Sequence, residues 1–348
     1  MKVLVVGTDL TSNGGIASVV KTFYKESKNH CVEYKLLKTT GYKHGSKLNN
    51  LIVFIKAIVI FLCSVKSIDA VHLQGSSHGS FYRKSIFLIL CKILGKPVIW
   101  NFHASRFEEF FLTKLGLRKE LVRFLLNKAD FVIVLSAKLK AELSNYYTLD
   151  NVIVLRNPVD PVSYSRDKLI RSTAYLKVIF LGFFIKNKGI LDLIEAAKVL
   201  ANDNIEFSFA GAGELQHVID EASNNTRLNV INLGWLDSED KYKAISDSDV
   251  LILPSYREGM PIVILEAMSI GVPVIATNIA AIPELIDDNK NGLLYEPGDL
   301  DGLVNCICRM KDADLRQKFS NLSSKKVENY YPDAVFKDLK KIYKEIVH

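Results

Sequence analysis

Short runs of Val, Ile and Leu alternate with longer helical patterns along nearly the whole chain. Runs that are apolar throughout indicate strands covered on both faces, and parallel sheets with crossover helices cover their strands in this way. We therefore predict an α/β fold. The predicted strands are residues 2–7, 32–37, 69–74, 97–103, 131–136, 152–157, 177–182, 205–211, 229–234, 250–255 and 273–278.

The 348 residues suffice for two domains of ordinary size. A polar segment with two prolines, residues 157–167, separates two series of strands and predicts a linker. We predict one doubly wound domain over residues 1–160 and a second over 161–331. A final helix, 332–348, is expected to pack back toward the first domain. The helices predicted in the first domain are 15–28, 48–66, 80–95 and 106–128.

Composition and cysteine spacing exclude several classes of protein. With 49% hydrophobic and 24% charged residues, the chain is neither disordered nor of low complexity. Its five cysteines include no C-x-x-C pair, which argues against a disulfide framework and a structural zinc site. The first residues predict a strand and a glycine loop rather than a signal peptide, and the longest apolar run, 51–63, is shorter than the roughly 20 residues of a bilayer span. We therefore expect a cytoplasmic protein.

Charge is distributed unevenly between the two predicted domains. Residues 1–160 carry a net charge of +12, whereas residues 161–348 carry −5. The first half is therefore expected to face an anionic partner, with a membrane surface or a lipid phosphate ranked above nucleic acid. No nucleic-acid-binding signature is present in the sequence, so nucleic acid is not expected as a partner.

The segment 253–277 predicts an anion-binding site. Pro261 suits the first position of a helix, and the helix start at Met260–Ile262 would present backbone N–H groups and a positive dipole beyond a strand end. Glu266 lies five residues farther on, about 7.5 Å along the axis, where it would reach a ribose attached to a bound phosphate. Glu258 would face the group beyond that phosphate. A merely solvated Glu266 is disfavoured, because an unpaired carboxylate in this apolar helix would be costly.

The Glu258-x7-Glu266 spacing, with Gly259 and Pro261 inside it and GVPVIAT following, resembles the signature of glycosyltransferase family 4. The resemblance covers essentially the full chain. It implies the GT-B fold, in which two Rossmann-like domains face each other across a cleft. It also implies retaining transfer of a sugar from a nucleotide-diphosphate sugar.

A second stretch, 181–200, resembles the family's donor-phosphate turn. The family usually has Gly-Arg-x4-Lys-Gly there, with the Arg and the Lys on the pyrophosphate of the donor. Lys188 and Gly189 match, but Phe183 stands where the Arg is expected. This departure removes a bidentate phosphate partner and leaves Lys188 as a point charge, with Lys186 as an alternative cation.

The resemblance assigns roles to further residues, each with a plainer alternative. Gly15 belongs to the family's N-terminal glycine loop or to an ordinary tight turn, and His103 is either a contact to the donor sugar or a structural histidine. Gly211 and Trp235 line the nucleotide pocket or form ordinary strand–helix turns. The residues thus implied in catalysis are His103, Lys188 and Glu258; those implied in donor binding are Gly15, Lys188, Gly211, Trp235, Met260, Pro261, Ile262 and Glu266.

The expected function is retaining glycosyl transfer to a glycan or lipid-linked saccharide in bacterial surface polysaccharide biosynthesis. We expect no cofactor and no metal, and we interpret Asp247-Ser-Asp249 as a helix end. Residues 48–66 and 107–128 combine apolar bulk with Lys and Arg, which fits core helices or a peripheral membrane contact. Three alternatives remain: a sugar-nucleotide epimerase of the same architecture, a nicotinamide-dependent dehydrogenase, whose glycine fingerprint is missing, and a non-catalytic carbohydrate- or membrane-binding protein.

Overall fold

The chain forms two compact units in the computed structural model, which describes residues 1–7, 15–39, 47–103, 108–112, 116–162 and 175–347. The first unit comprises Met1–Pro158 together with Tyr330–His348, and the second comprises Val159–Asn329. The first unit is thus built from two separate stretches of sequence, and the C-terminal helix belongs to it.

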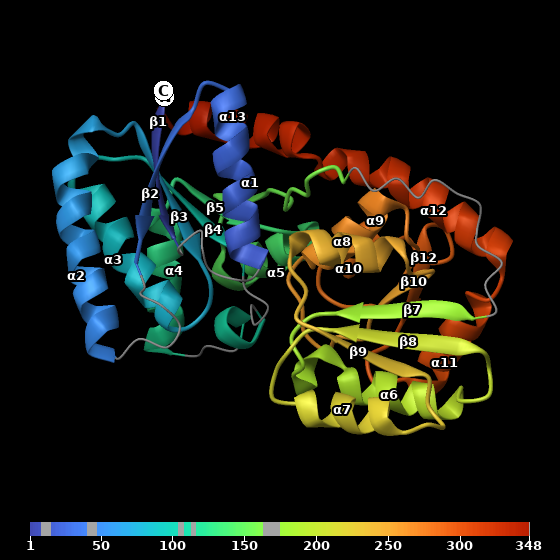
Figure 1. Ribbon diagram of the computed structural model, residues 1–348. Helices are drawn as coiled ribbons and strands as arrows, with labels where there is room; N and C mark the ends of the chain where they lie inside the picture. The colour runs from blue at the N-terminus through green and yellow to red at the C-terminus, as the bar shows by residue number, and fades with distance from the viewer. Residues whose placement is uncertain (8–14, 40–46, 104–107, 113–115, 163–174, 348) are drawn as a thin grey trace. The chain divides into compact units, whose positions relative to one another are not determined.

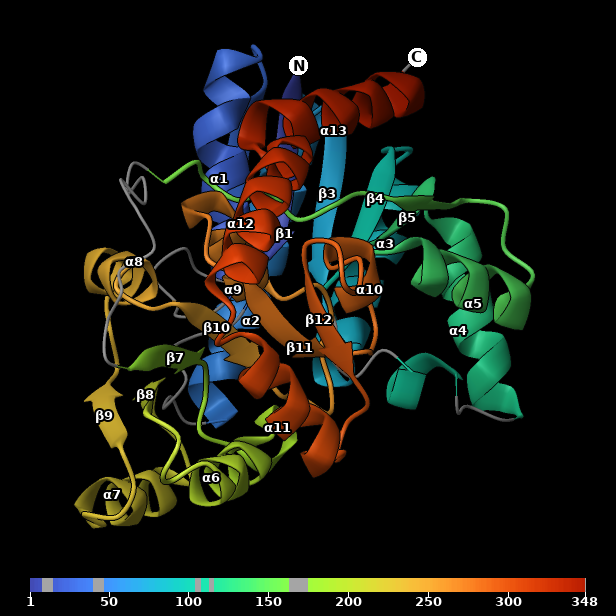
Figure 2. The same cartoon turned by 90° about the vertical axis from the view of Figure 1, so that its right-hand side faces the viewer.

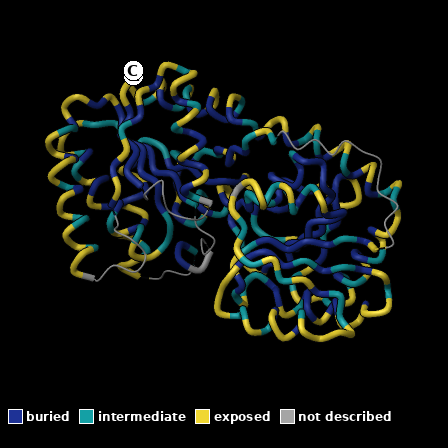
Figure 3. Tube along the Cα trace, viewed as in Figure 1, coloured by how far each residue is buried: buried dark blue, intermediate teal, exposed yellow. Residues whose placement is uncertain are grey.

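The first unit is built on a parallel sheet of order β2-β1-β3-β4-β5-β6 (Figure 1). Apart from the edge strands β2 and β6, its strands are almost wholly buried, as their apolar runs predicted (Figure 3). The strands are β1 (Lys2–Gly7), β2 (Glu33–Lys38), β3 (Ala70–Gly75), β4 (Val98–Phe102), β5 (Phe131–Val134) and β6 (Val152–Val154).

Helices cover both faces of this sheet. The crossovers that run from β2 toward β6 place α2–α5 on one face, where they share one apolar core, and α1 and α13 pack together on the other (Figures 1 and 2). The helices are α1 (Gly15–Asn29), α2 (Lys47–Ser64), α3 (Gly79–Ile93), α4 (Leu117–Lys128), α5 (Ala137–Tyr147) and α13 (Pro332–Val347), with a short 3-10 turn at Val65–Ser67.

The predicted helix over 106–128 is wrong as a single element. The structure has a π-helical turn at Glu108–Leu112 and begins α4 at Leu117. Gly116, directly before α4, has a φ of 61°, a left-handed conformation that a right-handed helix cannot continue through. The positive φ of Gly116 therefore marks where α4 begins, a boundary that hydropathy alone does not predict.

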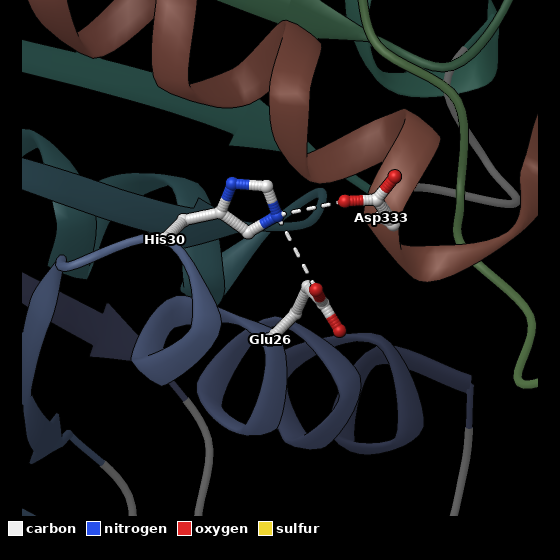
Figure 4. Close-up of side chains that lie close together, drawn as sticks. All are labelled: Glu26, His30 and Asp333. Atoms are coloured by element: carbon white, nitrogen blue, oxygen red, sulfur yellow. Dashed lines mark ion pairs between the residues drawn. The ribbon is translucent and has the colours of Figure 1, made fainter.

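Helix α13 is held by aromatic and ionic contacts within the first unit. Phe336 packs edge-on against Phe23 of α1 and stacks on His30, with ring centroids 6.2 and 5.0 Å apart. The Nε2 atom of His30 also lies 3.3 Å from Glu26 and 3.2 Å from Asp333 (Figure 4). These three potential ligand groups lie close enough together to hold a metal ion, but Asp333 is largely exposed. The arrangement is accounted for as an ion pair that joins α1 to α13.

The second unit has a parallel sheet of order β12-β11-β10-β7-β8-β9. Its last strand, β12, is absent from the predicted strands, because its four residues lie between polar and glycine-containing segments that favour turns. The strands are β7 (Leu176–Leu181), β8 (Ile205–Ala210), β9 (Val230–Gly234), β10 (Val250–Leu253), β11 (Val274–Thr277) and β12 (Gly292–Tyr295).

Its helices also form two layers, with α6 packed on α11 and α9 packed on α8 and α12. The chain runs outward in opposite directions from β7 and β10, which are adjacent, and these two strands form the topological switch point where ligands of such sheets bind. The helices are α6 (Ile190–Val199), α7 (Gln216–Asn224), α8 (Ser238–Ser246), α9 (Ile262–Ile270), α10 (Ile282–Leu285), α11 (Leu300–Arg309) and α12 (Ala313–Val327), with 3-10 turns at Lys186–Lys188 and Glu328–Tyr330.

Candidate active site

An ion pair between Lys188 and Glu258 joins the loops that follow β7 and β10. The Nζ of Lys188 lies 2.5 Å from a carboxylate oxygen of Glu258, which also accepts a hydrogen bond from the hydroxyl of Ser255 at 2.7 Å. Gly189 has a φ of 69°, and a Cβ there would lie 1.9 Å from the carbonyl oxygen of Pro254. The close approach of the two loops thus requires glycine at 189, and it places a cation at the switch point.

Helix α9 begins beside this ion pair. We expected Pro261 to be its first residue; the structure makes Ile262 the first, and Pro261 caps the helix with an extended ψ of 114°. The prediction is therefore wrong by one residue. The positive end of the α9 dipole nevertheless lies at Met260–Ile262, two residues beyond Glu258, so helix and lysine together favour an anion there.

Glu266 is buried within α9 and paired with a cation. Its side chain is 6% exposed, and its carboxylate lies 2.5 Å from the Nζ of Lys241 on α8. Burial raises the pKa of Glu266, while the charge of Lys241 and hydrogen bonds from Lys241 and Tyr242 act in the opposite direction. The carboxylate is thus held in place by α8, as a preformed acceptor needs to be.

Lys241 is a residue that the sequence reasoning missed. A signal was available, because a glutamate inside the apolar run PIVILEAM requires a buried partner. Nothing in the sequence says which of the chain's many lysines that partner is. Ser255 was missed for a similar reason: it was interpreted only as the end of a strand.

Phe183 and Trp235 form an exposed aromatic pair at the strand ends of β7 and β9. Their ring centroids are 5.3 Å apart at an interplanar angle of 37°, and their exposed fractions are 37% and 48%. Between them, at the end of β8, a Cβ on Gly211 would lie 1.9 Å from the carbonyl oxygen of Gly182. Position 183, where the family usually has an Arg, therefore carries a Phe ring that contacts the ring of Trp235. Lys186, three residues farther along the chain, is exposed.

His103, at the end of β4 in the first unit, terminates a buried chain of hydrogen bonds. Its Nε2 donates to the side-chain oxygen of Gln74 at 2.5 Å, and the Gln74 amide donates to the Nε2 of His72 at 3.0 Å. The Nδ1 of His72 therefore carries the proton and donates to Tyr343 at 2.5 Å, and the Tyr343 hydroxyl bonds to Tyr34 at 2.6 Å. This order leaves the Nδ1 of His103 as an acceptor.

Both histidines are neutral at pH 7. Burial lowers the pKa of His72 to about 3, with the neighbouring His103 contributing, and burial lowers the pKa of His103 to about 4. His103 is therefore suited to accepting a hydrogen bond from a hydroxyl group and unsuited to acting as an acid near pH 7.

This histidine chain predicts that the first unit loses stability below pH 6.5. The unfolded histidines take up protons near their ordinary pKa of 6.5, whereas the folded ones remain neutral down to pH 3–4, so the free energy of unfolding falls as pH falls. The expected slope is up to about 1.4 kcal/mol per pH unit for each histidine. A Trp235→Phe background leaves the buried Trp100 of β4 as the fluorescent reporter of denaturation.

His72→Gln should flatten this pH dependence between pH 7.5 and 5, and His217→Gln, on the exposed surface of α7, should not. The variants and the parent have the same carboxylates, so a difference in slope between them is assigned to His72. An unchanged slope in His72→Gln would refute the assignment.

Two other predicted features have simpler outcomes. Asp247 caps the C-terminal end of α8 and the carboxylate of Asp249 accepts the backbone N–H of Lys177 at 3.0 Å, so Asp247-Ser-Asp249 marks a helix end, as predicted. Helix α1 begins at Gly15, but the glycine loop before it lies outside the described residues.

Comparison with known proteins identifies the family. Residues 16–162 match the profile described as Glycosyltransferase Family 4, and residues 176–312 match the profile described as Glycosyl transferases group 1. The chain belongs to glycosyltransferase family 4. The expected activity class is therefore confirmed: the protein is a glycosyltransferase, and its two Rossmann-like units are those of the GT-B fold.

Relatives of this glycosyltransferase include an uncharacterized 41.2 kDa protein in the cps region of Klebsiella pneumoniae, 28% identical over 88% of this chain and 86% of that protein. The UDP-Gal:alpha-D-GlcNAc-diphosphoundecaprenol alpha-1,3-galactosyltransferase of Escherichia coli is 34% identical over 43% of this chain and 39% of its own. Among solved structures, Anabaena HepE in complex with UDP superposes with a TM-score of 0.77 at 18% identity, over 99% of this chain and all of that one.

Proposed function

We propose that this glycosyltransferase moves a sugar, with retention, from a nucleoside-diphosphate sugar to a lipid-linked saccharide during assembly of a bacterial surface polysaccharide. The observation that carries the proposal is the cation Lys188 beside the N-terminal end of α9 at the switch point of the second unit. The Escherichia coli relative, named for a diphosphoundecaprenol acceptor, supports the acceptor class. An acceptor of this kind is reached at a membrane surface, so the enzyme is proposed to work there from the cytoplasmic side.

Donor binding is proposed to use residues of the second unit. Lys188 and the start of α9 at Met260–Ile262, capped by Pro261, hold the diphosphate, and Glu266 accepts hydrogen bonds from the ribose. Gly211 permits close approach of the backbone, and Trp235, with Phe183 against it, offers a ring face to the base. In this arrangement aromatic contact replaces the guanidinium that the family usually has at position 183.

In the proposed transfer step, the main requirement is to stabilise the negative charge of the departing diphosphate. The bond from the anomeric carbon to the diphosphate oxygen breaks, the acceptor oxygen bonds to that carbon on the same face, and the acceptor proton passes to the departing phosphate oxygen. Lys188 and the α9 dipole stabilise the developing negative charge. Glu258 orients the sugar, His103 accepts a hydrogen bond from a sugar hydroxyl, and Gly15 lets the backbone approach the donor phosphate or the acceptor. No metal or cofactor has a role in the proposal.

The proposal predicts that a nucleoside diphosphate stabilises the protein in EDTA. The measurement is a thermal shift with UDP, GDP, ADP, TDP and CMP, followed by the sugars of the nucleotide that binds; UDP comes first because HepE is complexed with it. A ligand at 100 times its Kd adds about 2.7 kcal/mol. Uridine without phosphates and a Lys188→Met variant are the controls, and both should give a much smaller shift. The absence of a shift with every nucleotide would overturn the donor assignment.

A further inference from the structure

Helix α2 exposes most of its apolar side chains. It contacts the core of the first unit through a narrow stripe that includes Phe54, Ala57, Ile58 and Phe61. The opposite side carries large exposed residues at helical spacing, which are Leu48, Leu51, Ile52, Ile55, Val59, Ile60 and Leu62. In Figure 3 the outer turns of α2 are accordingly yellow.

The next two helices repeat this pattern. In α3 the exposed large side chains recur every three or four residues, at Tyr82, Ile86, Ile89 and Ile93. In α4 they recur in the same way at Leu117, Leu121 and Phe124. Each series follows one side of its helix, opposite the side that packs on the sheet.

These three series are neighbours. Phe87 of α3 contacts both Phe54 and Phe61 of α2, with ring centroids 5.9 and 5.4 Å apart. On the other side of α3, the hydroxyl of Tyr82 accepts a hydrogen bond from Arg118 of α4 at 3.1 Å. The three helices cover the same face of the sheet (Figure 1), so we treat their exposed residues named above as one surface, the α2–α4 face. A soluble monomer rarely exposes so many large apolar side chains on one side without a partner.

The charge of the α2–α4 face favours an anionic partner. The three helices contain nine Lys and Arg residues and a single acidic residue, Glu120. Lys56 lies among the exposed apolar residues of α2, and Lys128 lies over the ring of Phe124, 5.2 Å from its centroid. Apolar side chains interspersed with long cationic ones match the interface of an anionic bilayer, where the rings and alkyl groups enter the acyl boundary and the cations meet the phosphates.

The topology excludes the alternative that α2 crosses the membrane. By length and composition Leu48–Ser67 is apolar enough to do so, a longer apolar stretch than the sequence run 51–63 suggested. However, α2 connects β2 to β3, and both strands pair with β1 in the same sheet. One crossing would place β2 and β3 on opposite sides of the bilayer. The helix is therefore expected to lie parallel to the membrane surface.

We propose that the α2–α4 face is the surface by which the first unit docks on an anionic lipid leaflet. The inference deepens the proposed function, because it names the partner that brings the enzyme to a lipid-linked acceptor. Its test is separate, since vesicle binding needs neither donor nor acceptor, and nucleotide binding is measured without lipid.

The test measures co-sedimentation with vesicles of 30% phosphatidylglycerol in phosphatidylcholine. A triple variant, Ile55→Gln with Ile86→Gln and Phe124→Gln, removes one exposed apolar residue from each helix and should weaken the partition coefficient at least tenfold. The matched control makes the same kind of change in the second unit, at Leu191, Val199 and Leu322, whose exposure is comparable. The control should bind as the parent does. Raising NaCl from 0.1 to 0.5 M should weaken binding of the parent several-fold.

Two native cysteines give a second readout that does not rely on apolar substitutions. Cys63 is exposed on α2, and Cys31 is exposed between α1 and β2. A polarity-sensitive dye on Cys63, in a Cys31→Ser protein, should shift to the blue on adding vesicles. The same dye on Cys31, in a Cys63→Ser protein, should shift less.

Three outcomes would overturn the proposal. The first is that the parent protein fails to bind these vesicles. The second is that the triple variant binds them as tightly as the parent does. The third is that sedimentation shows a dimer of the parent, which does not bind vesicles, and that the triple variant is monomeric. The last outcome would assign the α2–α4 face to a second copy of the chain.

Discussion

Replacing Lys188 with Met is expected to lower the turnover of the glycosyltransferase by 10²- to 10³-fold. Lys188 is the cation fixed at the start of α9, 2.5 Å from Glu258, where the charge on the departing diphosphate would develop. Removal of one preorganised donor at such a position costs roughly 2.7–4 kcal/mol of transition-state stabilisation. The variant also leaves the Glu258 carboxylate with Ser255 as its remaining described partner. Release of nucleoside diphosphate, followed as a function of donor concentration, separates kcat from KM.

Two lysines serve as controls for this result. Lys198→Met removes an exposed ion pair with Glu195 on α6 and should leave turnover nearly unchanged, because surface pairs contribute little. Lys186→Met tests the neighbouring cation. If Lys186→Met is inactive and Lys188→Met is nearly normal, the diphosphate contact belongs to Lys186.

The second large effect is expected at Glu266. Glu266→Gln should weaken UDP binding by one to two orders of magnitude, because a charge-assisted hydrogen bond contributes about 1.5–3 kcal/mol. Gln is preferred to Ala, since removing one member of the buried pair with Lys241 outright would destabilise the fold by about 3–5 kcal/mol. Calorimetric titration with UDP gives the affinity directly.

A ribose analogue makes this prediction specific. The parent should bind 2′,3′-dideoxy-UDP much more weakly than UDP, whereas Glu266→Gln should hardly distinguish the two. Lys241→Gln removes the cation but keeps a side-chain N–H donor for the carboxylate, and it should keep the distinction. Equal discrimination in Glu266→Gln and the parent would show that the carboxylate serves the packing of α8 on α9 and not the ribose.

The strands of both sheets could be predicted because a strand that is buried on both faces has an unbroken run of apolar residues in the sequence. Gly116 and β12 were harder: one residue with a positive φ ends a helix pattern, and a four-residue strand between turns carries little signal. In the candidate active site, the position of the loop around Glu258, between β10 and α9, could be predicted from the spacing of local motifs. The Lys241–Glu266 pair and the Phe183–Trp235 contact depend on which strand ends become neighbours, and that is settled by the whole sheet.

The hydrogen-bond chain from His103 to Tyr343 has a consequence for biosynthesis. Its donors and acceptors come from β2, β3, β4 and α13, and α13 follows the three strands by more than two hundred residues, since β4 ends at Phe102 and α13 begins at Pro332. The second unit, continuous between Val159 and Asn329, is complete before that helix exists. Most of the first unit is therefore synthesised before the second unit, but the first unit is completed only after α13 has been made. Until then the hydrogen-bond chain lacks Tyr343, the partner of His72 and Tyr34. The orientation of His103, at the other end of the chain, is therefore fixed late in folding.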